Sequence, residues 1–285
     1  MISTSRRKFN QSLAFTILRT AIYINVLALA IFVGFIVVNG ISAISWEFLT
    51  EAPRDSMTKG GIWPCIVGTV YISLGSVLVA FPIGVGTAIY LNEFAGKGRW
   101  TRIVRMGIIN LAGVPSVVYG LFGLAFFVII LNMGVSLLAG SLTLGAFILP
   151  LIIGSAEEAL RNIPQSYREA SLALGATKWQ TIYKIVLPAA LPSMLTGLIL
   201  GMSRAAGETA PIMFTAAVFS TGKIPTSIFD EIMVMPYHIY VLATAGTNID
   251  ETRPLQYGTA LVLICLVLGM NLTAIIIRNK LQKKY

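Results

Sequence analysis

Two charged residues, Arg204 and Glu208, lie near the middle of a long apolar stretch at about 189–217. A charge at the centre of a membrane costs about 2.5–3.5 kcal/mol on insertion scales, so charged residues at that depth usually mark the route of a solute or an ion. At four-residue spacing both side chains share one helix face, which lowers the cost of each charge. A guanidinium donates parallel N–H bonds that suit a tetrahedral oxyanion. We interpret the pair as part of an anion path; an ion pair that only fixes helix packing is the alternative.

Three residues with hydroxyl groups are candidates for the same path. Ser203 and Thr209 flank the charged pair, and Ser116 follows Pro115 in another apolar stretch. The proline interrupts the backbone hydrogen bonds of that stretch, and the Ser116 hydroxyl could bond either the freed backbone groups or a solute. A serine that simply satisfies a kinked helix is the alternative interpretation.

The sequence around Glu208 also indicates how its helix packs and where it loosens. Gly207 and Pro211 bracket the carboxylate, and we expect them to loosen the helix there and to free backbone N–H groups. Small residues recur every four positions and predict close approach of another helix. They are Ser193, Gly197, Gly201, Ala205 and Thr209.

A charged, amphipathic segment, 157–188, precedes this stretch. It contains two capping-box patterns, SYRE at 166–169 and TKWQ at 177–180, with Gly175 between them. A glycine suits the left-handed end of a helix, so the pattern predicts a helix at about 166–174, a turn, and a second helix. Large apolar residues on so small a surface predict a docking site for a partner. They are Tyr167, Leu172, Leu174 and Trp179.

The composition indicates that these elements belong to a membrane protein. The chain of 285 residues is 56% hydrophobic and 12% charged, and it contains long uncharged runs. A span needs about 20 apolar residues, and on that basis we predict an all-α membrane protein with six spans. Pro150 is expected to bend or end the short fourth span. The spans are expected at about 20–43, 64–91, 110–132, 141–156, 189–217 and 256–277.

The distribution of basic residues predicts the orientation. Four groups of four Lys and Arg residues lie on one side of the spans, and the opposite side has only Arg54, Lys59, Lys223 and Arg253. The positive-inside rule therefore puts both termini in the cytoplasm. The basic groups lie within 6–19, 97–105, 161–184 and 278–284.

We therefore divide the chain into three parts. A cytoplasmic N-terminal segment, 1–19, precedes the six-span domain, 20–277, and a cytoplasmic tail, 278–285, follows it. Within the domain, 157–188 is the main inner loop and 218–255 the main outer segment. Part of the outer segment, 225–246, reads as a surface-lying or re-entrant helix. It either receives an external partner or is a solvated connection.

Several functions find no support in the sequence. The net charge of +9 comes without an aromatic and basic motif, so nucleic acid is not an expected partner. The phosphate-binding pattern GxxxxGK[ST] does not occur, and we expect the chain to bind no ATP. His238 has no companions for a metal site, and Cys65 and Cys265 fall in or beside apolar spans. We expect neither a metal nor another cofactor on this chain.

The inner loop resembles the EAA loop of ABC importer permeases. The matching positions are Glu169, Ala170, Ser171, Gly175, Ile185, Leu187 and Pro188. Ser171 is a departure, because the general pattern has alanine there. The resemblance implies the MetI-like permease fold and a helix at Glu169–Gly175 that docks on a cytoplasmic ATPase. ATP and Mg would then be bound by that ATPase, and this chain would not be an enzyme.

Three longer phrases resemble the permeases of phosphate-specific ABC importers: GVPSVVYGLFG at 113–123, LGATKWQTIYKIVLPAALPS at 174–193 and SRAAGETAPIMFTA at 203–216. The ETAP continuation is more similar to the PstA-type subunit than to its PstC-type partner. The resemblance implies a permease of the bacterial inner membrane that moves phosphate past Arg204 and Glu208. It also implies a PstC-like permease, a PstB-like ATPase dimer and an external PstS-like phosphate-binding protein as partners.

Other functions compete with this interpretation. An importer of molybdate, tungstate or sulfate would have the same fold and inner loop. An ion-driven secondary transporter or channel often shows inverted repeats, and we find no convincing repeat. A membrane enzyme would need a cluster of His, Asp or Cys residues on the inner or outer face, and the sequence offers none.

Overall fold

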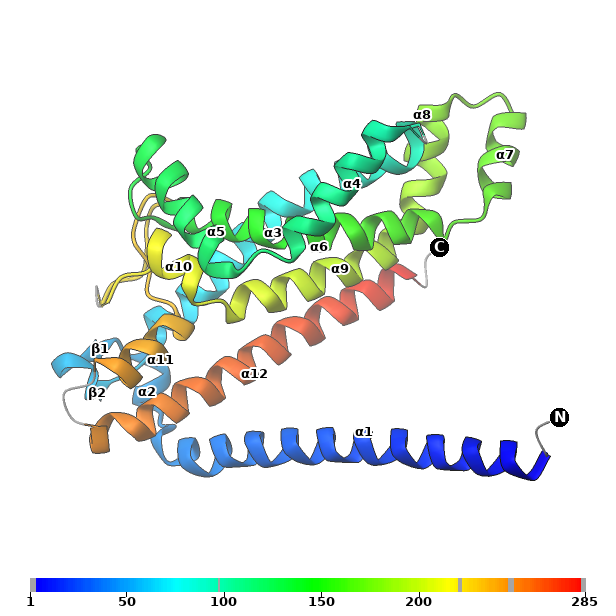
Figure 1. The fold of residues 1–285 in the computed structure, drawn as a ribbon. Coiled ribbons are helices and arrows are strands. Elements are labelled where there is room, and N and C mark those ends of the chain that lie inside the picture. Colours follow the sequence, from blue (N-terminus) through cyan, green and yellow to red (C-terminus); the bar gives the residue numbers. More distant parts are fainter. Residues whose placement is uncertain (1–3, 97, 220–221, 246–248, 283–285) are drawn as a thin grey trace.

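The computed structural model describes residues 4–96, 98–219, 222–245 and 249–282. Within these ranges the chain is almost entirely helical. Two strands, β1 (Pro53–Arg54) and β2 (Lys59–Gly60), form a short antiparallel ribbon. Figure 1 shows α7, α8 and both chain ends toward one end of the bundle, and β1, β2, α2 and α11 at the opposite end.

The helices follow one another along the described chain with these bounds: α1 (Thr4–Gly40), α2 (Trp46–Thr50), α3 (Trp63–Ile89), α4 (Arg99–Ala112), α5 (Ser116–Gly123), α6 (Leu137–Arg161), α7 (Gln165–Ala173), α8 (Lys178–Thr181), α9 (Leu187–Gly207), α10 (Ala210–Thr215), α11 (Met235–Thr244) and α12 (Ile249–Gln282). Short 3₁₀ turns follow α1 and β1, at Ile41–Ala43 and Asp55–Met57. π-Helical turns extend α3 at Tyr90–Phe94 and α5 at Leu124–Ile130, and Ile182–Val186 joins α8 to α9.

Helices of sufficient length and hydropathy confirm an all-α membrane protein with five or six spans, against the six predicted. In the described residues, five continuous segments are long and apolar enough to cross a membrane, and the bent pair of α4 and α5 makes a sixth if the two helices are counted as one broken span. The continuous segments are Gln11–Ala43, Trp63–Phe94, Leu137–Arg161, Lys178–Gly207 and Thr252–Gln282. The helices at both ends of the chain extend beyond the predicted spans, since α1 starts at Thr4 and α12 continues to Gln282.

Three of the predicted spans differ from the observed helices. The third is not one helix at 110–132, because α4 and α5 meet at an angle of 101° next to Pro115. Proline lacks the backbone N–H and disfavours helical geometry in the preceding residue. The fourth, at 141–156, was predicted too short, because α6 extends beyond both ends, from Leu137 to Arg161, and does not end at Pro150. The fifth ends at Gly207 instead of continuing to 217.

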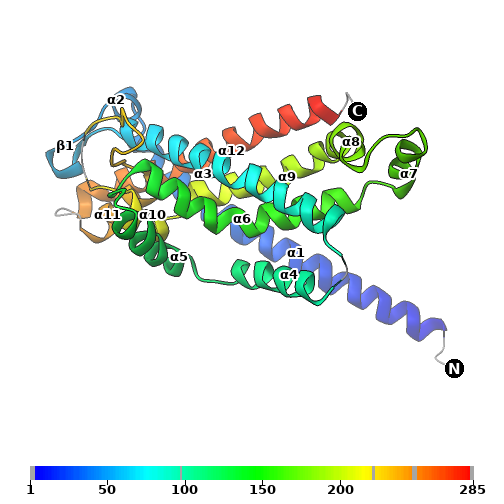
Figure 2. The same ribbon diagram turned by 90° about the horizontal axis from the view of Figure 1, so that it is seen from above.

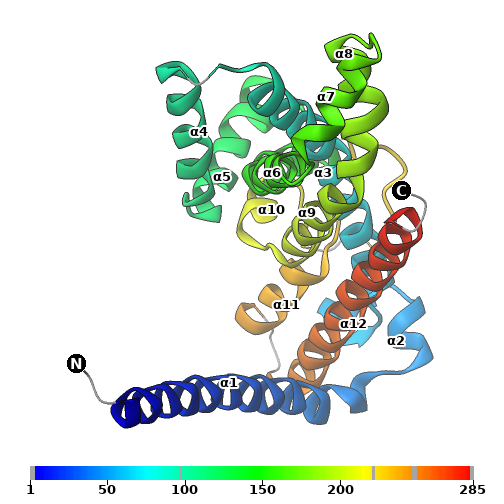
Figure 3. The ribbon, with the colours of Figure 1, turned by 90° about the vertical axis from the view of Figure 1, so that its right-hand side faces the viewer.

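Helix α6 lies at the centre of the bundle. Figure 3 shows it almost end-on, surrounded by α3, α9, α10 and α5, and Figure 2 shows α4 and α5 on one side of this core and α12 on the other. The predicted stripe of small residues is confirmed only in its middle part, where α9 packs against α6; Ser193 is exposed, and Thr209 lies beyond the end of α9. A Cβ atom on Gly197 would lie 1.7 Å from Ser155 Oγ, and Gly201 faces Ile148 and Ile152. In contrast, the described side chains of α1 are mostly exposed, and the helix is buried at Ile36 and Gly40.

The outer segment is a folded part of the structure. Helix α11 buries Met235, His238, Val241 and Leu242. Preceding residues bond the start of α6, whose first N–H groups have no partner within the helix. Leu137 N donates to the Asp230 carbonyl at 2.8 Å, Leu138 N to the Ile228 carbonyl at 2.8 Å, and Ser136 N to the Thr215 carbonyl at 3.0 Å. These contacts tie the outer segment to the start of α6.

Candidate functional site

Arg204 and Glu208 stand at a break in the fifth span. Arg204 lies in the last turn of α9, and Glu208 is the first residue after it, with an extended backbone (φ −76°, ψ 141°). The predicted loosening at Gly207 therefore occurs, but it removes Glu208 from the helix face that we expected it to share with Arg204. Pro211 lies in the first turn of α10, where its missing N–H is not needed. The chain thus restarts as a new helix two residues after Glu208.

The ion pair between these residues is loose. Arg204 Nε lies 4.0 Å from Glu208 Oε1, and the two side chains are 44% and 20% exposed. This distance is at the outer limit of an ion pair and well beyond the 2.7–2.9 Å of a charge-assisted hydrogen bond. The guanidinium therefore keeps most of its capacity to bind another anion.

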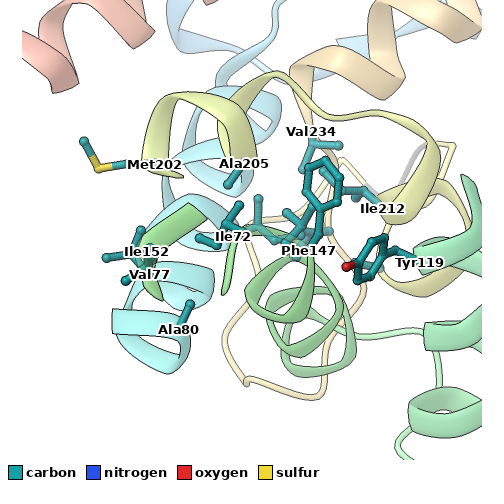
Figure 4. Close-up of a cluster of buried hydrophobic side chains, with 14 residues drawn as sticks. Ile72, Val77, Ala80, Tyr119, Phe147, Ile152, Met202, Ala205, Ile212 and Val234 are labelled. Carbon is teal, nitrogen blue, oxygen red and sulfur yellow. The ribbon is translucent and has the colours of Figure 1, made fainter. Parts of the chain in front are cut away.

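Two aromatic rings support the Arg204 guanidinium. Its central carbon lies 4.4 Å from the centre of the Phe147 ring of α6, which is a cation–π contact. Phe147 packs edge to face against Tyr119 of α5, with ring centres 5.3 Å apart, and Figure 4 shows the two side chains next to each other. The Tyr119 hydroxyl donates a 3.0 Å hydrogen bond to the Leu111 carbonyl, near the bend between α4 and α5. Three separate helices thus set the position of one charged group.

Sequence reasoning missed Tyr119 and Phe147. Both lie in apolar runs, where an aromatic residue is ordinarily part of the core, and both are indeed buried. The available signal was the position of Tyr119, three residues after the candidate Ser116.

The structure brings together some of the predicted hydroxyl residues and separates others. Ser116 is the first residue of α5, and its side chain interacts with the Glu208 carboxylate. Thr209 immediately precedes α10, and its carbonyl accepts a hydrogen bond from Met213 N at 3.0 Å. Ser203 instead contacts α12, because its hydroxyl lies 2.6 Å from Asn271 Oδ1. Ser203 therefore links two helices.

The inner loop forms the expected pair of helices, with one correction. A capping box at Thr177 and Gln180 starts α8, and the turn residue Gly175 has the left-handed backbone (φ +83°) that was predicted. The capping box predicted at 166–169 is wrong. Helix α7 begins one residue earlier, at Gln165, and its N-terminal cap is Pro164, which has no side-chain bond.

The predicted coupling residues occupy two environments. Glu169, Ala170 and Gly175 are exposed, as are the large apolar residues around them. Leu174 is 90% exposed, and Tyr167, Leu172 and Trp179 are also exposed, as predicted. Ile185, Leu187 and Pro188 are half-buried at the π-helical turn and the start of α9.

Ser171, the departure from the EAA pattern, has a definite structural position. It is buried, and its hydroxyl lies 2.9 Å from the Thr181 hydroxyl. This contact joins α7 to α8.

A comparison with known proteins decides the family. Residues 80–285 match the family described as "Binding-protein-dependent transport system inner membrane component". The chain belongs to this family. It is a multi-pass permease of the inner membrane, and the family consists of non-catalytic membrane subunits, in agreement with the predictions.

Relatives align with the permease along most of its length. It is 33% identical over 270 residues to the probable ABC transporter permease protein YqgI of Bacillus subtilis, covering 90% of this chain and 91% of the relative. It is 34% identical over 281 residues to the phosphate transport system permease protein PstA 1 of Mycobacterium tuberculosis, covering 96% of this chain and 90% of the relative. These matches agree with the resemblance stated from the sequence.

A solved structure confirms the fold. The permease superposes on a chain of the bacterial alginate ABC transporter, crystallised with a periplasmic protein bound to an alginate pentasaccharide, with a TM-score of 0.65. The match covers 98% of both chains at 17% identity. A chain of the inward-facing MetNI methionine ABC transporter gives a TM-score of 0.63 at 20% identity, covering 76% of this chain and 94% of that chain. The MetI-like permease fold was therefore predicted correctly.

Proposed function

We propose that this permease forms half of the membrane path of a bacterial ABC importer for inorganic phosphate. The observation that carries the proposal is the loosely paired Arg204 guanidinium at the break after α9. The named phosphate permease among its relatives supports the same solute.

The geometry suggests how phosphate passes this point. A phosphate oxyanion accepts parallel N–H bonds from the guanidinium, which Phe147 holds from one side. Glu208 stands close enough to compete for the guanidinium and repels the anion. Exchange between the carboxylate and the phosphate keeps the bound state short-lived, as passage requires. Ser116 and Thr209 flank Glu208 and complete the polar group.

The second part of the proposal concerns the partner subunits and the coupling of transport to ATP hydrolysis. Helices α7 and α8 and the turn between them present Glu169 and the exposed apolar residues to a cytoplasmic PstB-like ATPase dimer, which binds ATP and Mg. A PstC-like permease supplies the other half of the path, and an external PstS-like protein delivers phosphate. Closure of the ATPase dimer moves α7, and the two permeases rock between outward-open and inward-open states. The location of α7 and both chain ends toward one end of the bundle supports a common cytoplasmic side (Figure 1).

Uptake of labelled phosphate tests this proposal. Cells that lack their own high-affinity system receive the permease with its neighbouring subunits, either unchanged or as Arg204→Gln. We expect uptake that phosphate inhibits and molybdate or sulfate does not. Because the variant loses charge-assisted bonds, its uptake falls by about tenfold or more.

The control is Arg54→Gln, which removes an exposed arginine of the β1–β2 ribbon and leaves uptake unchanged. Membrane fractions must contain equal amounts of assembled complex. Uptake of molybdate or sulfate in place of phosphate would contradict the proposed solute, and full uptake by Arg204→Gln would contradict the proposed site.

A further inference from the structure

A second arginine, Arg168 of α7, binds three elements at once. Its Nη2 donates to Glu93 Oε1 at 2.8 Å and to the Leu160 carbonyl at 3.0 Å. Its Nε contacts Glu93 Oε2 at 3.4 Å, and its Nη1 donates to the Ile163 carbonyl at 2.8 Å. Glu93 lies in the π-helical turn that ends α3, and Leu160 lies at the end of α6. One guanidinium thus connects α7 to the inner ends of α3 and α6.

The Arg168–Glu93 pair is largely buried. The two side chains are only 13% and 8% exposed, whereas the neighbouring Tyr167 and Glu169 are exposed. Helix α7 therefore presents one face outward and turns Arg168 toward the bundle. Removing one partner of a buried pair leaves an uncompensated charge and is strongly destabilising locally, unlike the loss of a surface pair.

A cavity lies next to the Arg168–Glu93 pair, on the side of α7 that faces the bundle. A cavity of about 660 Å³ lies beneath α7, lined by Glu93, Arg168, Leu172, Lys178 and neighbouring residues. Because this space is open, α7 does not rest on a packed apolar core at this point. Directional hydrogen bonds from Arg168 therefore connect α7 to α3 and α6 on this side.

Helix α8 reaches the same turn of α3. The ammonium group of Lys178 donates to the Glu93 carbonyl and lies 4.9 Å from the centre of the Phe94 ring. Since Ser171 and Thr181 join α7 to α8, the two helices attach to α3 as a unit. π-Helical turns such as Tyr90–Phe94 occur frequently at functional positions.

We infer that the Arg168–Glu93 pair is the joint that transmits movement of α7 to α3 and α6. The inference rests on the proposed docking of an ATPase on α7. From the joint, α3 packs tightly along α6, since a Cβ atom on Gly84 would lie 2.6 Å from the Ile152 side chain. Helix α6 carries Phe147, which contacts Arg204. A continuous path of packed groups thus connects the docking helix with the solute site, and Arg168 and Glu93 act as positioning residues in it.

The test uses the complete transporter in proteoliposomes with its binding protein, and it measures ATP hydrolysis and solute uptake in the same preparation. The variants are Arg168→Gln, Glu93→Gln and the double variant. We expect solute transported per ATP hydrolysed to fall by about five- to tenfold in each, the range of a typical coupling between sites. Hydrolysis itself persists, because the docking face of α7 is unchanged. The double variant falls no further than either single variant, because the pair acts as one unit.

Two further variants guard against a trivial loss of structure. Glu158→Gln removes an exposed carboxylate from the same end of α6 and leaves the ratio unchanged. Arg168→Lys keeps the charge but cannot reproduce the forked donation, so it lowers the ratio by an intermediate amount. Only complexes that contain all subunits are compared.

An unchanged ratio in Arg168→Gln and Glu93→Gln would overturn the inference. So would a parallel loss of hydrolysis and uptake, because that result indicates a docking defect. Wild-type complexes that import a different oxyanion would contradict the proposed solute but not the joint, since the ratio is then measured with that oxyanion.

Discussion

Two of the arginine–glutamate pairs in the described part of the permease, Arg204–Glu208 and Arg168–Glu93, have opposite geometry. The pair at the break after α9 is separated by 4.0 Å, and its arginine is 44% exposed. The pair between α7 and α3 is closed at 2.8 Å, and its arginine is 13% exposed and also bonds two backbone carbonyls. A loose pair can exchange its partner for a solute, whereas a tight pair transmits displacement. The same two residue types therefore serve two purposes, and distance and burial decide which.

Charge reversal at Glu208, in the loose pair, is expected to have the largest effect on phosphate uptake. In Glu208→Lys a second cation stands next to Arg204 and holds an anion more strongly, so release is slow. The added lysine forms charge-assisted hydrogen bonds that strengthen phosphate binding at this site. We therefore expect phosphate uptake to fall by about tenfold or more. Initial uptake rates measure this effect, and Glu158→Lys on the exposed face of α6 serves as the control. Unchanged uptake in Glu208→Lys would show that the loose pair has no part in passage.

Loss of the Phe147 ring has a smaller expected effect. Phe147→Leu keeps an apolar side chain in the core but removes the cation–π contact with Arg204. Such a contact contributes about 0.5–2 kcal/mol, so the maximal uptake rate is expected to fall by about twofold or more. Phe32→Leu on the exposed part of α1 is the matched control. If both variants transport equally well, the ring does not position the arginine.

The pH dependence of stability reports on His238, a buried polar residue that belongs to neither pair. His238 of α11 is buried, and its Nδ1 has no hydrogen-bond partner among the described residues. Burial lowers its pKa from 6.5 to about 4. The unfolded chain therefore binds a proton that the folded chain excludes, so the stability contributed by neutral His238 is complete above pH 6.5 and declines as the pH falls toward 4.

We expect thermal unfolding of the purified complex to shift to lower temperature by a few degrees between pH 7 and pH 5, and the shift to be smaller in His238→Met. The difference between the two proteins isolates the contribution of this chain, because His238 is its single histidine. An identical shift in both proteins would contradict it.

Local patterns in the sequence were sufficient to predict most of the spans and the turn in the inner loop. Uninterrupted apolar runs located the spans, Gly175 and the capping box at Thr177 located the turn between α7 and α8, and the EAA spacing indicated the family. Pro150 does not end the fourth span, which was one of the two outcomes expected of it, since α6 continues through it. A buried proline is tolerated where packing on all sides compensates for the lost hydrogen bond.

The joint and the aromatic support of Arg204 could not be predicted in this way. Glu93 and Arg168 are 75 residues apart, and no local pattern connects them. Phe147 and Arg204 meet only because the small residues of α9 let it approach α6 closely. Contacts of this kind depend on how distant helices pack, so they become visible only in the folded chain.

One uptake measurement tests the difference between the two pairs most directly. Each member of each pair is neutralised alone and together, as Arg204→Gln, Glu208→Gln, Arg168→Gln and Glu93→Gln with the two corresponding double variants. We expect the tight pair to respond symmetrically, with equal losses and no further loss in the double variant. The loose pair is expected to respond asymmetrically, because loss of Arg204 removes the anion contact and loss of Glu208 removes only its competitor. A symmetric response of the Arg204–Glu208 pair would contradict the account.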